Sequence, residues 1–226
     1  MDYTPLFISI KTAGVATIIS LILGILFAWN IIKIKSYLKN IFDCILTLPM
    51  VMPPTVLGYF LLKIFGVNGF IGEFFLEFFD KRIVFSWEAT VISAVVVSLP
   101  LMYRTLRSTF EQLNKNLIYS AKTLGITNTK IFFRIVIPNS FGGLISGIIL
   151  SFARALGEFG ATMMLAGNIP GKTQTISTAV YSAMSAGNED LAYKWVAVNL
   201  IISCNLLFER IILSNFIFPV KISSVL

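Results

Sequence analysis

The stretch between Lys11 and Lys33 contains no charged residue, and this run restricts the possible folds more than any other feature of the chain. A helix that crosses a bilayer needs roughly 20 apolar residues, and this run supplies them. It is also too long for the apolar part of a cleaved signal peptide, and no basic residue lies at the extreme N-terminus. We therefore expect a retained transmembrane helix here.

Composition extends this expectation to the whole chain. Of its 226 residues, 56% are hydrophobic and only 13% are charged, which is too little charge for a soluble domain of this size. We expect an all-α integral membrane protein that crosses the cell membrane several times. Its net charge of +7 does not indicate nucleic-acid binding, because most basic residues flank apolar segments.

Apolar periodicity and length predict five spans in total. The first is the charge-free run, and four more follow at residues 44–62, 87–103, 141–166 and 192–208, with 211–218 as an extension of the last. The two connections richest in Lys and Arg follow the first and third spans. Cytoplasmic loops carry such an excess, so we expect the N-terminus outside and the C-terminus in the cytoplasm.

Prolines interrupt the second span within "LPMVMPPTVLGYFLL". Pro49, Pro53 and Pro54, with Thr55 beside them, remove backbone donors and predict a kinked helix. Broken spans often line a transport path, so these four residues are candidates for a translocation path or gate. A kink that serves only helix packing is the alternative.

Residues 114–138 form a polar, basic interruption in the third connection. Leu117, Ile118, Ala121 and Leu124 recur at helical spacing and predict a short helix with one apolar side. Gly125 permits a sharp helix end with positive φ, and Thr127 or Asn128 can cap the next helix. The pattern predicts a stiff cytoplasmic finger that docks on a partner; a loop resting on lipid headgroups is the alternative.

The same stretch resembles the cytoplasmic loop motif of ABC importer permeases, E-A-A-x-x-x-G followed after nine residues by I-x-L-P. The matching positions, with Leu124 directly before the glycine, are Tyr119, Ser120, Ala121, Gly125, Ile135, Ile137 and Pro138. Tyr119 stands where the family often has glutamate and Ser120 where it has alanine. The resemblance implies that this loop couples the chain to an ATPase, although an acidic contact from position 119 is missing.

Three further stretches, "LPMVMPPTVLGY", "SFARALGEFGAT" and "GNIPGKTQTISTAVY", resemble the molybdate permeases of the sulfate/molybdate permease family. The resemblance covers nearly the whole chain and implies a single permease domain over residues 1–226 with the type I (MetI-like) importer fold. It also implies a homodimer, two cytoplasmic ABC ATPase subunits and an extracytoplasmic oxyanion-binding protein. ATP would be used by the partner ATPase.

"GNIPGKT" has three residues between its glycines where a phosphate loop needs four, so we expect no nucleotide site and no ATPase activity in this chain.

Arg154 and Glu158, four residues apart in the fourth predicted span, can pair on one helix face. A charge at membrane depth is costly, so the pair should face protein or water. We favour a structural role over a place on the path.

The chain has no histidine, which removes the commonest metal ligand and the usual general base. We therefore expect no catalytic residues, metal site or cofactor of its own. The sequence predicts the permease of an ATP-driven molybdate importer that works by alternating access. A tungstate or sulfate permease is the nearest alternative, and an ATP-independent secondary transporter is the alternative from another class.

Overall fold

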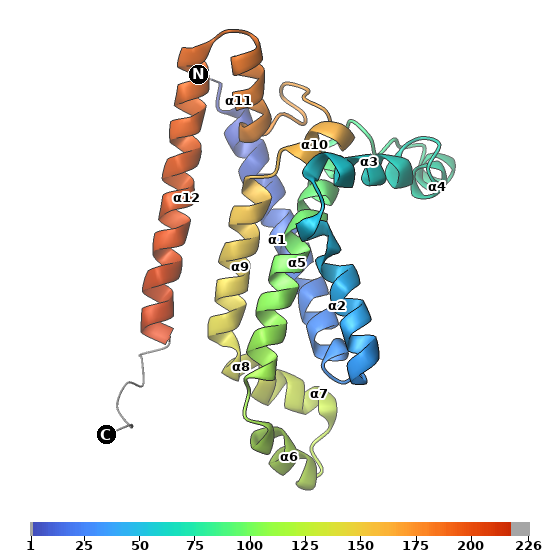
Figure 1. The fold of residues 1–226 in the computed structure, drawn as a ribbon, viewed down its shortest axis with the longest axis vertical. Coiled ribbons are helices and arrows are strands. Elements are labelled where there is room, and N and C mark those ends of the chain that lie inside the picture. The colour runs from blue at the N-terminus through green and yellow to red at the C-terminus, as the bar shows by residue number, and fades with distance from the viewer. Residues whose placement is uncertain (1, 218–226) are drawn as a thin grey trace.

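The computed structural model describes residues 2–217, and every regular element within this range is a helix (Figure 1). The elements are α1 (Thr4–Ile31), α2 (Ser36–Val51), α3 (Pro54–Phe65), α4 (Phe70–Phe79), α5 (Trp87–Glu111), α6 (Lys115–Thr123), α7 (Asn128–Ile131), the π-helix η1 (Phe132–Val136), α8 (Ile137–Asn139), α9 (Phe141–Leu156), α10 (Gly160–Leu165), α11 (Ile176–Ser185) and α12 (Glu189–Ile217).

Three of these helices are long and apolar enough to cross a membrane by themselves, namely α1, α5 and the part of α12 up to Glu209. Two bent pairs raise the number of candidate spans within the described range to five. The first pair joins α2 to α3 with a bend of 111°, and the second joins α7–α8 to α9 with a bend of 72°. The all-helical membrane architecture expected from the sequence is therefore confirmed.

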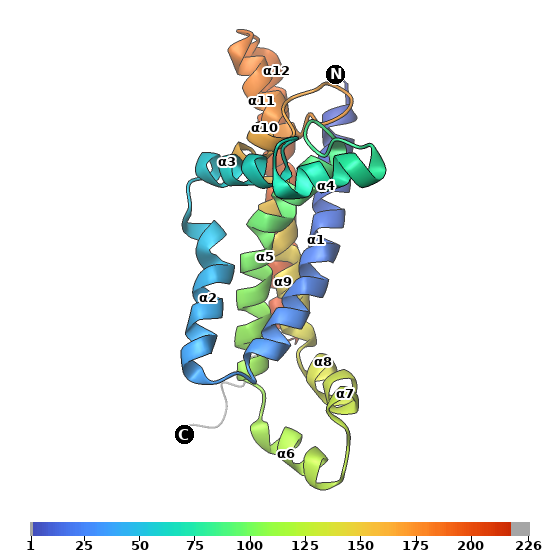
Figure 2. The same ribbon diagram turned by 90° about the vertical axis from the view of Figure 1, so that its right-hand side faces the viewer.

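Helix α5 lies at the centre of the bundle and runs parallel to α1 (Figures 1 and 2). Two hydroxyl pairs join the helices, Thr12 with Thr90 at 3.0 Å and Ser20 with Ser98 at 2.9 Å between side-chain oxygens. Each helix advances by eight residues from one pair to the next, which fixes a parallel register. Such interhelical hydrogen bonds stabilise helix pairs where apolar burial cannot distinguish protein from lipid.

Small residues bring α9 close to α5, and α9 also packs against α1. A Cβ atom at Gly143 would lie 2.1 Å from the Thr109 hydroxyl, and one at Gly147 would lie 2.9 Å from the Met102 sulfur. One turn further on, the Ser151 hydroxyl donates to the Ser98 carbonyl at 3.3 Å. This spacing of small residues every four positions permits the close helix approach common in membrane proteins.

The second predicted span is wrong as a single kinked helix. Helix α2 stays continuous through Pro49, and the chain then becomes extended at Met52 and Pro53 before α3 starts at Pro54. Neither proline nitrogen can donate a hydrogen bond, and a residue before proline avoids helical backbone angles, so the helix stops completely. Helix α3 therefore lies across the bundle rather than along it (Figure 2).

The fourth predicted span, residues 141–166, is also broken. Helix α9 ends at Leu156, and after Gly157 the separate helix α10 turns away to pack on α3. Only α9 of this region runs along the bundle, and the segment Asn128–Asn139 before it is bent away from α9 by 72°. The fifth span is confirmed as a helix that continues to Ile217, while Phe218 lies outside the described residues.

Segment α6–α8, here called the finger (residues 114–138), extends beyond one end of the bundle (Figures 1 and 2). The N-terminus and α11 lie at the opposite end. Helices α4 and α11 were not predicted, because each has only ten residues, too few to register as a span. Helix α4 carries five phenylalanines and, with α3, projects sideways near the end opposite the finger (Figure 1).

Candidate functional site

The helix end predicted at Gly125 is confirmed. Gly125 has a φ of +73°. Its amide donates to the Lys122 carbonyl at 2.9 Å, and the Ile126 amide donates to the Ala121 carbonyl at 3.1 Å. These two bonds form a Schellman motif, which ends α6 and turns the chain toward α7. Helix α7 starts at Asn128 as expected, but Thr127 makes no side-chain cap hydrogen bond.

The short helix predicted here is confirmed as α6, but its apolar side is not wholly open to a partner. Ala121 is only 4% exposed and joins a core cluster with Tyr103 of α5, and Ile118 packs against the same cluster. Leu117 and Leu124 are exposed, Leu124 to 79%. The apolar stripe therefore lies partly on the side of α6 that faces the bundle and partly on its outer side. One part therefore anchors the finger, and the other part is available to a partner.

The remaining residues of the resemblance also divide between anchor and surface. Tyr119 and Ser120 are exposed on α6. Ile135 lies half-buried in η1 and packs against the core cluster of Ala121, and Pro138 is exposed in the first turn of α8. The π-helix, a form found frequently at functional sites, was not predicted from the sequence.

The double-proline break lies directly against α10. A Cβ atom at Gly160 would lie 2.6 Å from Cβ of Pro54, and one at Gly58 would lie 2.7 Å from Cβ of Met164. The structure thus brings Pro54 close to the segment that carries Glu158, although about a hundred residues separate them in sequence. Pro53, Pro54 and Thr55 are exposed, whereas Pro49 is half-buried inside α2.

Arg154 and Glu158 pair as the spacing predicts, with 3.0 Å between the guanidinium nitrogen and carboxylate oxygen. They do not share a helix face, because α9 ends between them. Glu158 is 3% exposed and also accepts a hydrogen bond from the Ala161 amide at 2.8 Å, in the first turn of α10. Its carboxylate therefore links the last turn of α9 to the start of α10.

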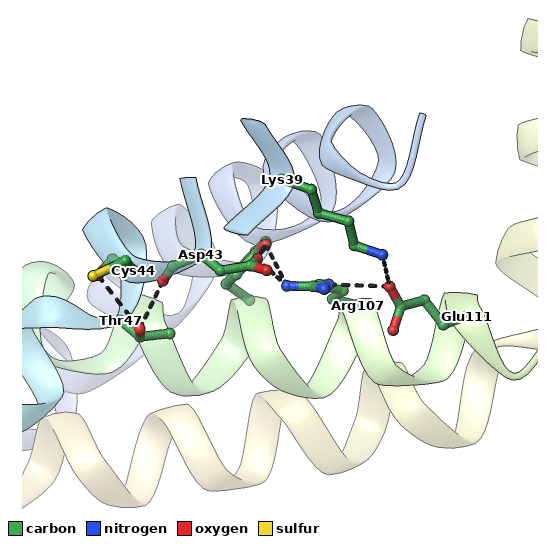
Figure 3. A network of polar contacts seen from close by, with 7 residues as sticks. Lys39, Asp43, Cys44, Thr47, Arg107 and Glu111 are labelled. Carbon is green, nitrogen blue, oxygen red and sulfur yellow. Dashed lines mark hydrogen bonds and ion pairs between the residues drawn. The ribbon is translucent and has the colours of Figure 1, made fainter. Parts of the chain in front are cut away.

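A cluster of polar contacts near the finger end of the bundle was not predicted (Figure 3). Arg107 of α5 forms ion pairs with Asp43 of α2 and with Glu111, the latter at 3.1 Å. Lys39 of α2 pairs with the same Glu111, and the Tyr103 hydroxyl donates to Asp43. Apart from Arg107 and Glu111, whose i,i+4 spacing was visible in the sequence, these contacts join residues 60 or more positions apart.

Together, the broken helices, the projecting finger and the polar cluster that ties α2 to α5 define an all-helical fold whose long helices are apolar enough to cross a membrane. Comparison with solved structures agrees. The chain superposes on a chain of the inward-facing MetNI methionine ABC transporter with a TM-score of 0.72, covering 91% of each chain at 13% identity. At that identity the match establishes the fold alone.

The family is also established. Residues 20–213 match the family described as "Binding-protein-dependent transport system inner membrane component". The chain belongs to this family of membrane subunits, which by that description serve transport systems with a binding protein.

Two relatives bear on the substrate. The molybdenum transport system permease protein ModB of Escherichia coli is 41% identical over 181 residues, covering 80% of this chain and 79% of its own length. The sulfate transport system permease protein CysT of Salmonella typhimurium is 33% identical over 202 residues, covering 89% of this chain and 73% of its own length.

Proposed function

We propose that this chain is the membrane permease of an ATP-driven importer that carries molybdate across the cell membrane. The observation that carries the proposal is the 41% identity to ModB along four-fifths of the chain. Identity to the sulfate permease CysT is lower, at 33%, so a sulfate permease is the less supported alternative. Tungstate shares the charge and tetrahedral shape of molybdate and remains the closest alternative substrate.

In this proposal residues 1–226 act as one permease domain with five spans, the N-terminus outside and the C-terminus in the cytoplasm. The finger and the basic connection after α1 lie at one end of the bundle, which supports a cytoplasmic position for both (Figure 2). The opposite end, with α11 and the N-terminus, would then face the external binding protein.

The finger would be the coupling element. Its exposed apolar residues Tyr119, Leu117 and Leu124 offer a surface to the ATPase, while Ala121 and Ile135 anchor it to the bundle core. Because the finger is held by buried contacts, a movement imposed on its outer side would be transmitted to α1 and α5. Neither ATP nor another cofactor would bind this chain itself.

Two copies would enclose the path, with the double-proline break close to it. Pro49, Pro53, Pro54 and Thr55 lie where α2 stops and α3 turns aside, so the break can act as a hinge between rigid helices. ATP binding and hydrolysis in the partners would move the fingers and rock these helices between outward-open and inward-open states. Arg154 and Glu158 would hold α9 and α10 together during that movement.

Competition for uptake tests the substrate assignment. Vesicles containing the permease and its ATPase would be supplied with the external binding protein and labelled molybdate. We expect tungstate to compete about as well as molybdate, and a hundredfold excess of sulfate to reduce uptake only slightly. Equal competition by sulfate would assign the chain to the sulfate permeases instead.

A further inference from the structure

A cavity of about 440 Å³ lies where the finger meets the end of α1. Trp29 and Lys33 line it from the α1 side, and Lys115, Tyr119 and Lys122 line it from α6. Asn128, the first residue of α7, completes its polar lining. The cavity thus lies between the end of α1 and the finger, two parts that must keep their relative position if the finger is to transmit movement.

The charge of this cavity is entirely positive. Three of its lining residues are lysines and none is acidic. Four ion pairs occur in the described part of the chain, and none of them involves these lysines. Like charges gathered in a partly enclosed space repel one another more strongly than they would in open water. An anion in the cavity would relieve that repulsion.

Lys33 is exposed, but its ammonium group rests against an aromatic ring. Its ammonium nitrogen lies 4.0 Å from the centre of the Trp29 ring, within the range of a cation–π contact. Partial burial, and then the nearby charge of Lys122, lower the pKa of Lys33. The ammonium group of Lys33 thus lies on the Trp29 ring and near the positive charge of Lys122, an arrangement that a bound anion would stabilise.

We propose that this cavity binds a phosphate group or another tetrahedral oxyanion, held by Lys33, Lys115 and Lys122. The Asn128 amide and the Tyr119 hydroxyl line the same space and can donate hydrogen bonds to it. The group could belong to an anionic lipid or to a free inorganic anion. Basic pockets at the cytoplasmic ends of membrane helices are suited to lipid headgroups, and a lipid source rests on the orientation given above.

Binding would tie the finger to the bundle. Lys33 follows α1, whereas Lys115 and Lys122 lie at the two ends of α6, so one anion would bridge both elements. The bound state should therefore be more stable to heat than the empty state, since a ligand that binds only the folded protein stabilises it. This effect requires neither the ATPase nor transport, so its failure would leave the proposed transport function untouched.

The test compares two double variants of the full chain, purified in detergent without the ATPase. Lys115→Gln with Lys122→Gln removes two charges from the cavity and leaves the contact between Lys33 and Trp29 intact. Lys35→Gln with Lys130→Gln removes the same charge from exposed positions of the same end that do not line the cavity. Lys115→Arg with Lys122→Arg keeps the charge and serves as the conservative variant.

Melting temperature would be measured with phosphatidylglycerol against phosphatidylcholine, and separately with sodium phosphate and sodium molybdate against sodium chloride of equal ionic strength. We expect an anion to raise the melting temperature of the parent, of the Lys35/Lys130 glutamine variant and of the Lys115/Lys122 arginine variant. In the Lys115/Lys122 glutamine variant, the anion concentration that gives half of the maximal rise in melting temperature should increase at least about tenfold. If phosphatidylglycerol alone has an effect, the ligand of the cavity is a lipid headgroup. If phosphate or molybdate has an effect, the ligand is a free anion.

Three results would overturn the proposal. In the first, neither phosphatidylglycerol nor phosphate nor molybdate raises the melting temperature of the parent. In the second, stabilisation persists undiminished in the Lys115/Lys122 glutamine variant. In the third, that variant melts below the parent in chloride, because removing charges that repel one another should leave the empty protein equally or more stable.

Discussion

The backbone of Gly125 controls the direction of the finger. Its φ of +73° is strained for any residue with a Cβ atom, although open space surrounds the position. Gly125→Val should therefore cost about 1–3 kcal/mol of local strain and displace the chain after α6. We expect normal membrane insertion, but weak co-purification with the ATPase or ATP hydrolysis that no longer drives uptake.

Gly187 provides the matched control for this variant. It ends α11 with a φ of +71°, and a Cβ atom at this position would also have no neighbouring atom within 4 Å. Its amide and that of Asn188 make the same pair of bonds to the preceding helix. Gly187→Val should introduce similar strain at the end of the bundle opposite the finger and leave ATPase assembly unchanged. If both variants lost ATPase assembly, or if both kept assembly and ATP-driven uptake, the finger would not be the coupling element.

Glu158 tests whether the intramembrane ion pair is structural. Breaking a fully buried pair typically costs about 3–5 kcal/mol, and the 39% exposure of the Arg154 side chain should put the cost of Glu158→Gln near the lower end. Glu158→Ala should be worse by about 1 kcal/mol because it also removes the acceptor for the Ala161 amide. Folded yield in detergent and heat stability measure both effects.

If the pair is structural, the preference among molybdate, tungstate and sulfate should stay unchanged in whatever Glu158→Gln protein is recovered. Normal yield combined with a changed preference would place Glu158 on the translocation path.

At the scale of elements, α2 is fixed to α5 at its finger end and ends at the proline break. Arg107 contacts Asp43, Glu111 and the Tyr103 hydroxyl, whereas Lys39 contacts Glu111 alone (Figure 3). Arg107→Gln should therefore lower heat stability by at least about 1 kcal/mol more than Lys39→Gln. Equal losses would show that the cluster adds no more than an ordinary surface ion pair.

The long helices were predictable because each contains a charge-free apolar run, which lipid exposure demands. Helices α1 and α12 follow from this rule alone. The positive φ of Gly125 was also predictable, since only glycine adopts it readily at a helix end. These features depend on local sequence and the surrounding solvent.

What could not be predicted depends on contacts between distant segments. Two prolines indicated an interruption, but the bend of 111° is set by packing of α3 on α10. The burial of Ala121 and exposure of Leu124 depend on how α6 sits against α5. The pairing of Asp43 with Arg107 joins two helices whose register a single sequence does not reveal.

At the scale of the whole molecule, the finger, the central helix α5 and the proline break form one mechanical route. Finger residues share a buried cluster with α5, α5 holds α2 through the ion pairs, and α2 ends at the break against α10. In the proposed cycle the ATPase moves the finger and the route opens or closes the path. The cycle therefore requires that ATP hydrolysis by the partner supplies the energy for transport.

Uptake into sealed vesicles tests that claim most directly. The permease and its ATPase would be reconstituted, with ATP inside and the molybdate-loaded binding protein outside. We predict uptake only when both are present, and none when a non-hydrolysable nucleotide replaces ATP or when a proton or sodium gradient is imposed alone. Equal molybdate uptake driven by an ion gradient without ATP would contradict the account and make the chain a secondary transporter.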